Sequence, residues 1–221
     1  MIGTWKRRST ILQQDLSQLP HKSRSLLWEG EPVLEIHIAA QALPKQAPAR
    51  LTAYYQAAEP AWQARWENRL YPLACAAAGR ARAASRPFRP WCARLERQIT
   101  LDADGLLSLR LEAQEQTSSS RIARHRQGDV WQLPRGTPLA LSDLFPGRNW
   151  RKGVLEQVAA QIQSRTASGE CRFSPGWERL LPRRFDPERF YCMREGPAVF
   201  FPLCSIAPYA EGIPEFLLVS S

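Results

Sequence analysis

The clearest pattern in the chain is a strict alternation of apolar and polar residues over positions 91–101. The alternation resumes over positions 107–113, after the short segment 102–105 that ends in Gly105. A period of two predicts a strand with one buried and one solvated face. Because the connection is so short and contains a glycine, the two segments are predicted to pair as an antiparallel hairpin.

A helical period replaces this alternation in the segment that begins at Ala49. Apolar residues recur there at three- and four-residue steps: Leu51, Tyr54, Tyr55, Ala58, Trp62 and Trp66. The spacing predicts a helix, kinked or split at Pro60 and again at Pro72, that continues through the alanine-rich segment 75–84. Such an aromatic stripe is either core packing or a stacking platform for nucleic-acid bases. We interpret it as core, because few arginines interleave with it.

The remaining patterns complete the fold prediction. They are a β-branched strand at 33–38, an amphipathic helix from Trp150 to about Ser168, a hairpin at 190–201, a proline-shaped loop at 205–214 and a closing strand at 215–219. These elements predict an α+β fold, in which one antiparallel sheet of about five to seven strands is packed on one face by two main helices. We assign residues 31–221 to this single domain and residues 1–30 to a loosely packed N-terminal arm.

The charge of the chain changes this picture only in part. Its 221 residues carry a net charge of +9, which favours acidic partners at long range. The arginines, however, are scattered over the sequence. The richest local cluster follows the serines at 118–120 and contains Arg121, Arg124 and Arg126. This cluster is either a site for phosphate or carboxylate groups, including those of nucleic acid, or a charged strand edge that blocks aggregation.

Five cysteines stand at irregular spacing: Cys75, Cys92, Cys171, Cys192 and Cys204. They form neither a C-x-x-C metal site nor an even disulfide framework, so we expect free thiols, or one pair such as Cys192 with Cys204 if the chain is exported. No segment is apolar enough to span a membrane, and no export signal follows the basic residues near the N-terminus. The sequence alone therefore predicts a cytoplasmic chain, or an extracytoplasmic one if an anchor precedes it in a longer protein.

The sequence offers no constellation of residues for catalysis. The carboxylates in loops, such as Asp102, Asp143 and Glu211, lie far apart along the chain, and none of the three histidines has a local link to Ser142. We therefore predict a protein that is not an enzyme and that uses no cofactor and no metal ion.

Three segments in order resemble a known bacterial family. They are Leu139–Phe145 before a helix, Phe190–Phe201 with its Arg-Glu-Gly turn, and the Ile-Ala-Pro-Tyr-Ala-Glu-Gly loop at 206–212. Together they resemble the domain of unknown function typified by the extracytoplasmic C-terminal domain of the RsiV anti-sigma factor, which senses lysozyme. Related domains accompany polysaccharide deacetylases. The resemblance covers residues 31–221.

This resemblance implies a non-catalytic module that binds or senses a protein or a cell-wall ligand. It draws attention to Pro208, Tyr209 and Glu211 in the loop, which either anchor the loop on the sheet or belong to a partner surface. Two alternatives remain: a domain associated with a cell-wall polysaccharide enzyme, and a weak nucleic-acid binder that uses the arginine cluster. The positive net charge argues against a cationic partner such as lysozyme.

Overall fold

A computed structural model describes residues 21–117, 122–145 and 147–219 of the chain. Its helices and strands follow in the order β1 (His21–Trp28), β2 (Glu31–Ala40), α1 (Ala49–Arg65), α2 (Tyr71–Ala83), β3 (Trp91–Ala103), β4 (Leu106–Gln116), β5 (Ile122–Gln132), β6 (Thr137–Pro138), α3 (Trp150–Ala167), α4 (Trp177–Arg184), β7 (Phe190–Met193), β8 (Gly196–Phe200) and β9 (Glu215–Leu217). The α+β prediction is confirmed.

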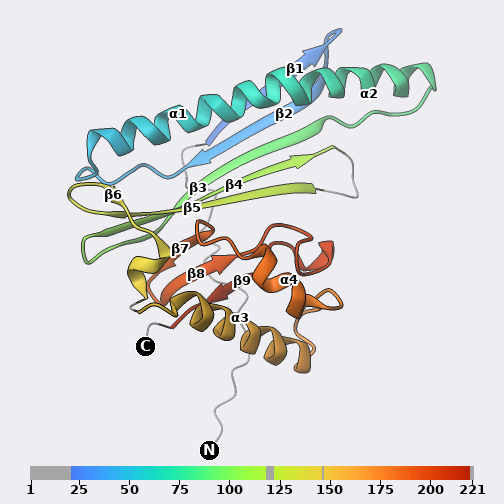
Figure 1. Ribbon diagram of the computed structural model, residues 1–221. Coiled ribbons are helices and arrows are strands. Elements are labelled where there is room, and N and C mark those ends of the chain that lie inside the picture. Colours follow the sequence, from blue (N-terminus) through green and yellow to red (C-terminus); the bar gives the residue numbers. More distant parts are fainter. Residues whose placement is uncertain (1–20, 118–121, 146, 220–221) are drawn as a thin grey trace, which may run out of the picture.

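The elements are arranged in layers (Figure 1). Strands β1 to β6 form one sheet, here called sheet A, and β7 to β9 form a second, antiparallel sheet B. The α1–α2 arm lies over one face of sheet A, while sheet B lies on the opposite side with α3 and α4 beyond it. The prediction of one sheet with both helices on one face was wrong in this respect. The C-terminal hairpin and closing strand form their own sheet, and α3 packs on that sheet through Val154, Val158 and Ile162.

Sheet A is mixed rather than wholly antiparallel. Its strand order is β1-β2-β3-β4-β5-β6, and the β2–β3 pair is parallel, with Ile36 opposite Ala93. A parallel pair needs a long crossover connection, and the α1–α2 arm supplies it. The antiparallel prediction failed at this pair because it treated the arm as a cover for the sheet and not also as the link between two neighbouring strands.

The predicted hairpin is confirmed as β3 and β4. Asp104 and Gly105 both have positive φ angles, 53° and 73°, in the two-residue connection between the strands. That backbone geometry matches the right-handed twist of the flanking strands, and an Asp-Gly pair tolerates it well. The turn therefore fixes the register that places Leu95, Leu109 and Leu111 in the core.

The first described residues belong to the sheet. Residues 21–28 were predicted to lie in the N-terminal arm, but they form β1 and pair along the outer edge of β2. Most of β1 is exposed, which explains why its sequence shows no alternation of apolar and polar residues that would predict a strand. Residues 1–20 of the predicted arm lie outside the described part of the chain.

The α1–α2 arm follows the predicted stripe with one shift. Pro60 lies inside α1, and the irregularity falls later, in a π-helical turn at Trp66–Leu70 that precedes Pro72. A proline has no N–H to donate, so the turn before Pro72 is free to adopt wider hydrogen bonding. The π turn directs Trp66 and Leu70 into the core over β2, β3 and β4.

Candidate functional site

The aromatic stripe of α1 divides into a buried row and an exposed row. Trp66 and Tyr55 are fully buried, whereas Tyr54 is 46% exposed and Trp62 is half-buried. Successive residues on a helix point about 100° apart, so Tyr54 and Tyr55 cannot both face the core. The prediction that the stripe is core holds for the buried row, and the exposed row is left to line a surface.

Every second side chain of strand β5 faces this exposed row of α1. The rings of His125 and Trp62 lie 5.8 Å apart, and Gln127 Nε2 donates a 3.0 Å hydrogen bond to the Tyr54 hydroxyl. Because side chains on a strand alternate between its faces, His125, Gln127 and Asp129 all point toward α1. Helix and strand thus form two walls with polar and aromatic groups between them.

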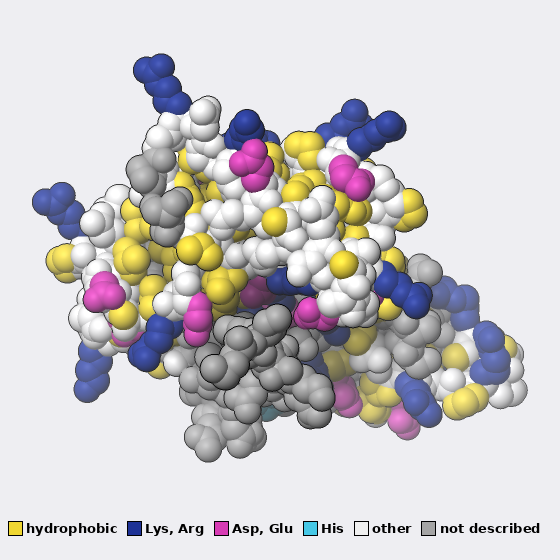
Figure 2. Space-filling model, turned by 90° about the horizontal axis from the view of Figure 1, so that it is seen from below, with side chains coloured by type: hydrophobic (Ala, Val, Ile, Leu, Met, Phe, Trp, Pro, Cys, Tyr) yellow, Lys and Arg dark blue, Asp and Glu magenta, His cyan; other side chains and the backbone are white. Residues whose placement is uncertain are grey.

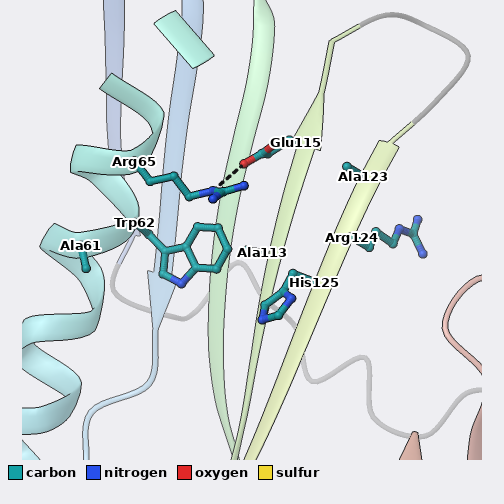
Figure 3. Close-up of a pocket in the computed structure, with 8 residues that line it drawn as sticks. All are labelled: Ala61, Trp62, Arg65, Ala113, Glu115, Ala123, Arg124 and His125. Atoms are coloured by element: carbon teal, nitrogen blue, oxygen red, sulfur yellow. Dashed lines mark hydrogen bonds and ion pairs between the residues drawn. The ribbon is translucent and has the colours of Figure 1, made fainter. Parts of the chain in front are cut away.

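Between these walls lies a groove, which we call the α1–β5 groove. It consists of a hollow of about 460 Å³ and a second of about 330 Å³, and both are lined by Ala61 and Trp62. The small side chains Ala61, Ala113 and Ala123 leave the space open. Figure 3 shows Trp62 reaching from the helix toward His125 on the strand, while Arg124 points away from both.

The polar groups of the groove are balanced in charge. Glu115 Oε1 accepts hydrogen bonds from Trp66 Nε1 at 3.0 Å and from Arg65 Nε at 3.4 Å, and the Arg65 guanidinium also stacks on Trp62. Burial, followed by the positive charges of Arg65 and a second arginine, lowers the pKa of His125. At neutral pH the imidazole is therefore uncharged, and it offers one donor and one acceptor to a ligand.

A tight network closes one end of the groove. The Tyr55 hydroxyl donates to Asp129 Oδ2 at 2.8 Å and accepts from Trp131 Nε1 at 2.8 Å, while Gln127 Nε2 donates to both Asp129 oxygens. Burial raises the pKa of both Tyr55 and Asp129. This network fixes α1 against β5, so the groove has rigid walls.

Arg126, which was predicted as a binding residue, is engaged inside the protein. Its guanidinium contacts Glu112 Oε2 at 2.8 Å and Glu215 Oε2 at 2.6 Å, and its side chain is only 12% exposed. Even-numbered residues of β5 face sheet B, which places Arg126 between the two sheets. Burial alone would raise the pKa of Glu112, but the adjacent Arg126 charge outweighs that effect and holds it below its usual value.

The structure brings together three other predicted residues at the start of β5. The Tyr209 hydroxyl accepts from the Ile122 N–H and donates to the Ile122 carbonyl at 3.1 Å, and the tyrosine remains 39% exposed. Pro208 precedes this tyrosine at the start of a short 3-10 turn. The exposed Arg124 guanidinium lies near Gly212 of the same loop. Tyr209 thus anchors the loop on β5 and leaves part of its ring at the surface.

The other two predicted residues do not join this group of contacts. Glu211 Oε1 accepts a 3.1 Å hydrogen bond from the Arg172 N–H, which ties the loop to the segment after α3. Arg121 lies outside the described residues.

The arginines that a nucleic-acid site would need do not share one surface. Arg126 is buried between the sheets, whereas Arg183 and Arg184 lie in the last turn of α4, beyond sheet B (Figure 1). In the view from below, the Lys and Arg side chains stand apart around the outline of the molecule (Figure 2). On this face, the described residues form no continuous basic track for a phosphate backbone.

Sequence reasoning missed four residues that line the groove: Tyr54, Trp62, His125 and Gln127. A signal for one of them, Tyr54, was present, since adjacent tyrosines at 54 and 55 cannot both be buried on one helix. No local signal could place His125 opposite Trp62, because that contact depends on which strand the helix crosses.

The described ranges contain neither a metal-ligand cluster nor a membrane-spanning helix. There, no three His, Cys, Asp or Glu side chains gather as metal ligands, and no helix is long and apolar enough to cross a bilayer. All five cysteines are free thiols, and burial raises the pKa of Cys192 to about 11.

The comparisons with known proteins show the fold. No protein-family model and no curated protein matches the chain. Among solved structures, it is similar to a DUF3298 family protein from Pseudomonas aeruginosa PAO1, with a TM-score of 0.56 and 18% identity over 90% of this chain and 89% of that chain. It is also similar to a DUF3298 family member from Bacteroides fragilis NCTC 9343, with a TM-score of 0.53 and 16% identity over 91% and 90% of the two chains. The chain thus has the fold of this bacterial family of unknown function.

Proposed function

We propose that the chain is a non-catalytic binding or sensing module, similar in role to the RsiV extracytoplasmic domain, and that its ligand enters the α1–β5 groove. The observation that carries the proposal is the exposed aromatic row. Tyr54 and Trp62 line a groove whose walls are held by buried hydrogen bonds. Exposed aromatic side chains on a rigid scaffold are typical of recognition surfaces.

The chemistry of the groove supports binding rather than catalysis. Its carboxylate, Glu115, already accepts hydrogen bonds from Trp66 and Arg65, which leaves the imidazole of His125 without a free carboxylate beside it in the groove lining. A general acid and base would need two groups free to exchange protons at one reacting atom. The groove instead offers a flat ring and fixed polar atoms, which suit recognition of a protein surface or a cell-wall fragment.

The test is a binding comparison between the wild-type chain and a Trp62→Ala variant. Purified protein is assayed against peptidoglycan fragments, sigma factors and lysozyme, each at low and moderate salt. We expect one of these ligands to bind and Trp62→Ala to weaken it about tenfold or more, as loss of an aromatic anchor does. The proposal predicts no turnover of that ligand.

A matched control is Leu73→Ala, which removes another exposed apolar side chain from the outer face of the helical arm. It should leave affinity unchanged. Equal affinity of wild type and Trp62→Ala for every ligand that binds would refute the groove as the binding site. If none of the three ligand classes binds, the proposed sensing role loses its support.

A further inference from the structure

Within the described part of the chain, one edge of sheet A is unpaired along part of β5. In an antiparallel pair, the N–H and C=O groups of every second residue point away from the partner strand. Ile122 gives both groups to the Tyr209 hydroxyl, and the Val130 carbonyl accepts from the Leu139 N–H, so the even-numbered residues of β5 point outward.

Two residues on this edge have no such partner. Among the described residues, none bonds to the outward N–H and C=O of Arg124 or Arg126. Gly128 is next in the same row but is buried where β7 lies against it, since a Cβ there would meet the Phe190 carbonyl oxygen at 2.0 Å. The open stretch therefore spans residues 123–127, between Tyr209 at one end and β6 at the other.

The described part of this edge is protected only by its charged side chains, of which Arg124 is exposed and Arg126 is buried in ion pairs. Residues 122–130 contain no proline, no lysine and no bulge in their pairing with β4. Proteins normally block an exposed strand edge with such features. An edge left open beside a groove is the arrangement that binds extended peptides by strand addition.

The charges around the open stretch favour an acidic partner. The Arg124 side chain is exposed, and the positive charges of Arg65 and Arg189 act on the neighbouring His125. The nearby carboxylates are already engaged. Glu112 and Glu215 pair with Arg126, and Glu115 pairs with Arg65. Arg65, Arg126 and Arg189 are also paired, each with a carboxylate. Among the described residues, Arg124 is therefore the one cation of this stretch without a salt-bridge partner, and an approaching chain meets that single exposed positive charge.

We propose that an acidic polypeptide segment binds as an added strand along residues 123–127 of β5. Its backbone pairs with the free groups of Arg124 and Arg126. One set of its alternate side chains lies beside the Arg124 guanidinium, and the other lies beside His125 and Gln127 at the margin of the α1–β5 groove. The inference rests on the proposed binding function, to which it assigns a partner and a mode of recognition.

The experiment separates backbone pairing from charge at one position. Arg124→Ser removes the guanidinium but keeps the outward N–H, whereas Arg124→Pro removes both. That N–H does not serve the β4–β5 ladder, so proline at 124 spares the sheet. The probe is an eight-residue peptide of alternating glutamate and valine, and its binding to the full chain is measured by calorimetry. Arg80→Ser, an exposed arginine on α2, is the control.

We expect Arg124→Ser to weaken peptide binding about fivefold and Arg124→Pro to weaken it at least tenfold further, because one hydrogen bond is lost and the ring obstructs the strand. Arg80→Ser should change it less than twofold. A peptide with lysine in place of glutamate, or with a central proline, should not bind. Circular dichroism of each variant verifies the fold. Should Arg124→Pro fail to fold, the backbone amide signals of positions 124 and 126, followed in both wild type and the Arg124→Ser protein, still report pairing by their shifts on titration.

Equal affinity of the serine and proline variants, or absence of peptide binding at low salt, would overturn the added strand. The proposed function has a separate readout. If peptidoglycan fragments or a folded protein bind in a manner that depends on Trp62 while the acidic peptide does not bind, the groove stands and the strand addition falls.

Discussion

The two faces of β5 differ in what their side chains do. On the face toward sheet B, Arg126, Gly128 and Val130 make contacts that hold the two sheets together. On the face toward α1, His125 and Gln127 border the groove. A single alternating strand thus supplies structural contacts with one set of residues and a recognition surface with the other. Within the face toward sheet B, Arg126 is buried in ion pairs while Arg124 stays exposed, so these two arginines do not act as a unit.

The largest expected effect on this comparison comes from Gly128→Val. A Cβ at 128 would meet backbone atoms of Phe190, which cannot move without separating the sheets. We expect a loss of more than about 3 kcal/mol in the free energy of unfolding, measured by urea denaturation. Gly153→Ala in α3 is the control, because nothing lies within 4 Å of its added methyl group. Near-native stability of Gly128→Val would show that the sheets are not in close contact.

Next in size is Arg126→Met, which leaves Glu112 and Glu215 buried without their cation. We expect a loss of about 3 kcal/mol at pH 7. In the wild type, the lowered pKa of Glu112 contributes stability that is present above its unfolded value and is lost as pH falls through its folded value. The deficit of the variant should therefore shrink on acidification. A deficit that is constant with pH would contradict this account.

A smaller effect is expected from Asp129→Asn at the closed end of the groove. Burial raises the pKa of Asp129, so its contribution to stability is present below the unfolded value and is lost as pH rises through the folded value. The wild type should lose stability relative to the variant over that rise, as followed by thermal unfolding at several pH values. Parallel curves for the two proteins would show that Asp129 is as solvated as in the unfolded chain.

The smallest effect should come from Tyr54→Phe on the open face. It removes one exposed hydrogen bond to Gln127 and keeps the ring. We expect a change in unfolding free energy of about 0.5 kcal/mol or less. A loss comparable to that of Arg126→Met would contradict the division between the faces of β5.

Much of the fold could be predicted from sequence because it is encoded locally. The alternation around the Asp-Gly turn predicted β3 and β4, and the glycine turn at Arg194–Pro197 predicted β7 and β8. The parallel β2–β3 pair and the separate sheet B depend on which strands become neighbours. Local periodicity contains no information about that choice, and the exposed β1 gave no apolar signal at all.

The candidate site was predicted less well, for a related reason. Arg126 reads as a surface charge in sequence, yet its carboxylate partners lie 14 and 89 positions away. The stripe pattern predicts that Trp62 lies in the core, yet α1 lies alongside β5 and places the Trp62 ring against His125 at a groove wall. The loop with Tyr209 was found by its proline and glycine pattern, but only the structure shows that its hydroxyl bonds to Ile122.

That tyrosine has a consequence for how the molecule can associate with itself or with others. An unpaired strand edge can add one chain after another and grow into a fibril. Here the Tyr209 hydroxyl bonds to Ile122 at one end of the unpaired stretch, and the short strand β6 pairs with β5 at the other end. A peptide strand that pairs with β5 is therefore limited to residues 123–127, and its pairing cannot shift or lengthen along the strand. On the proposed strand addition, only a segment about as long as residues 123–127 pairs with this edge, which makes it a short template for an intermolecular sheet.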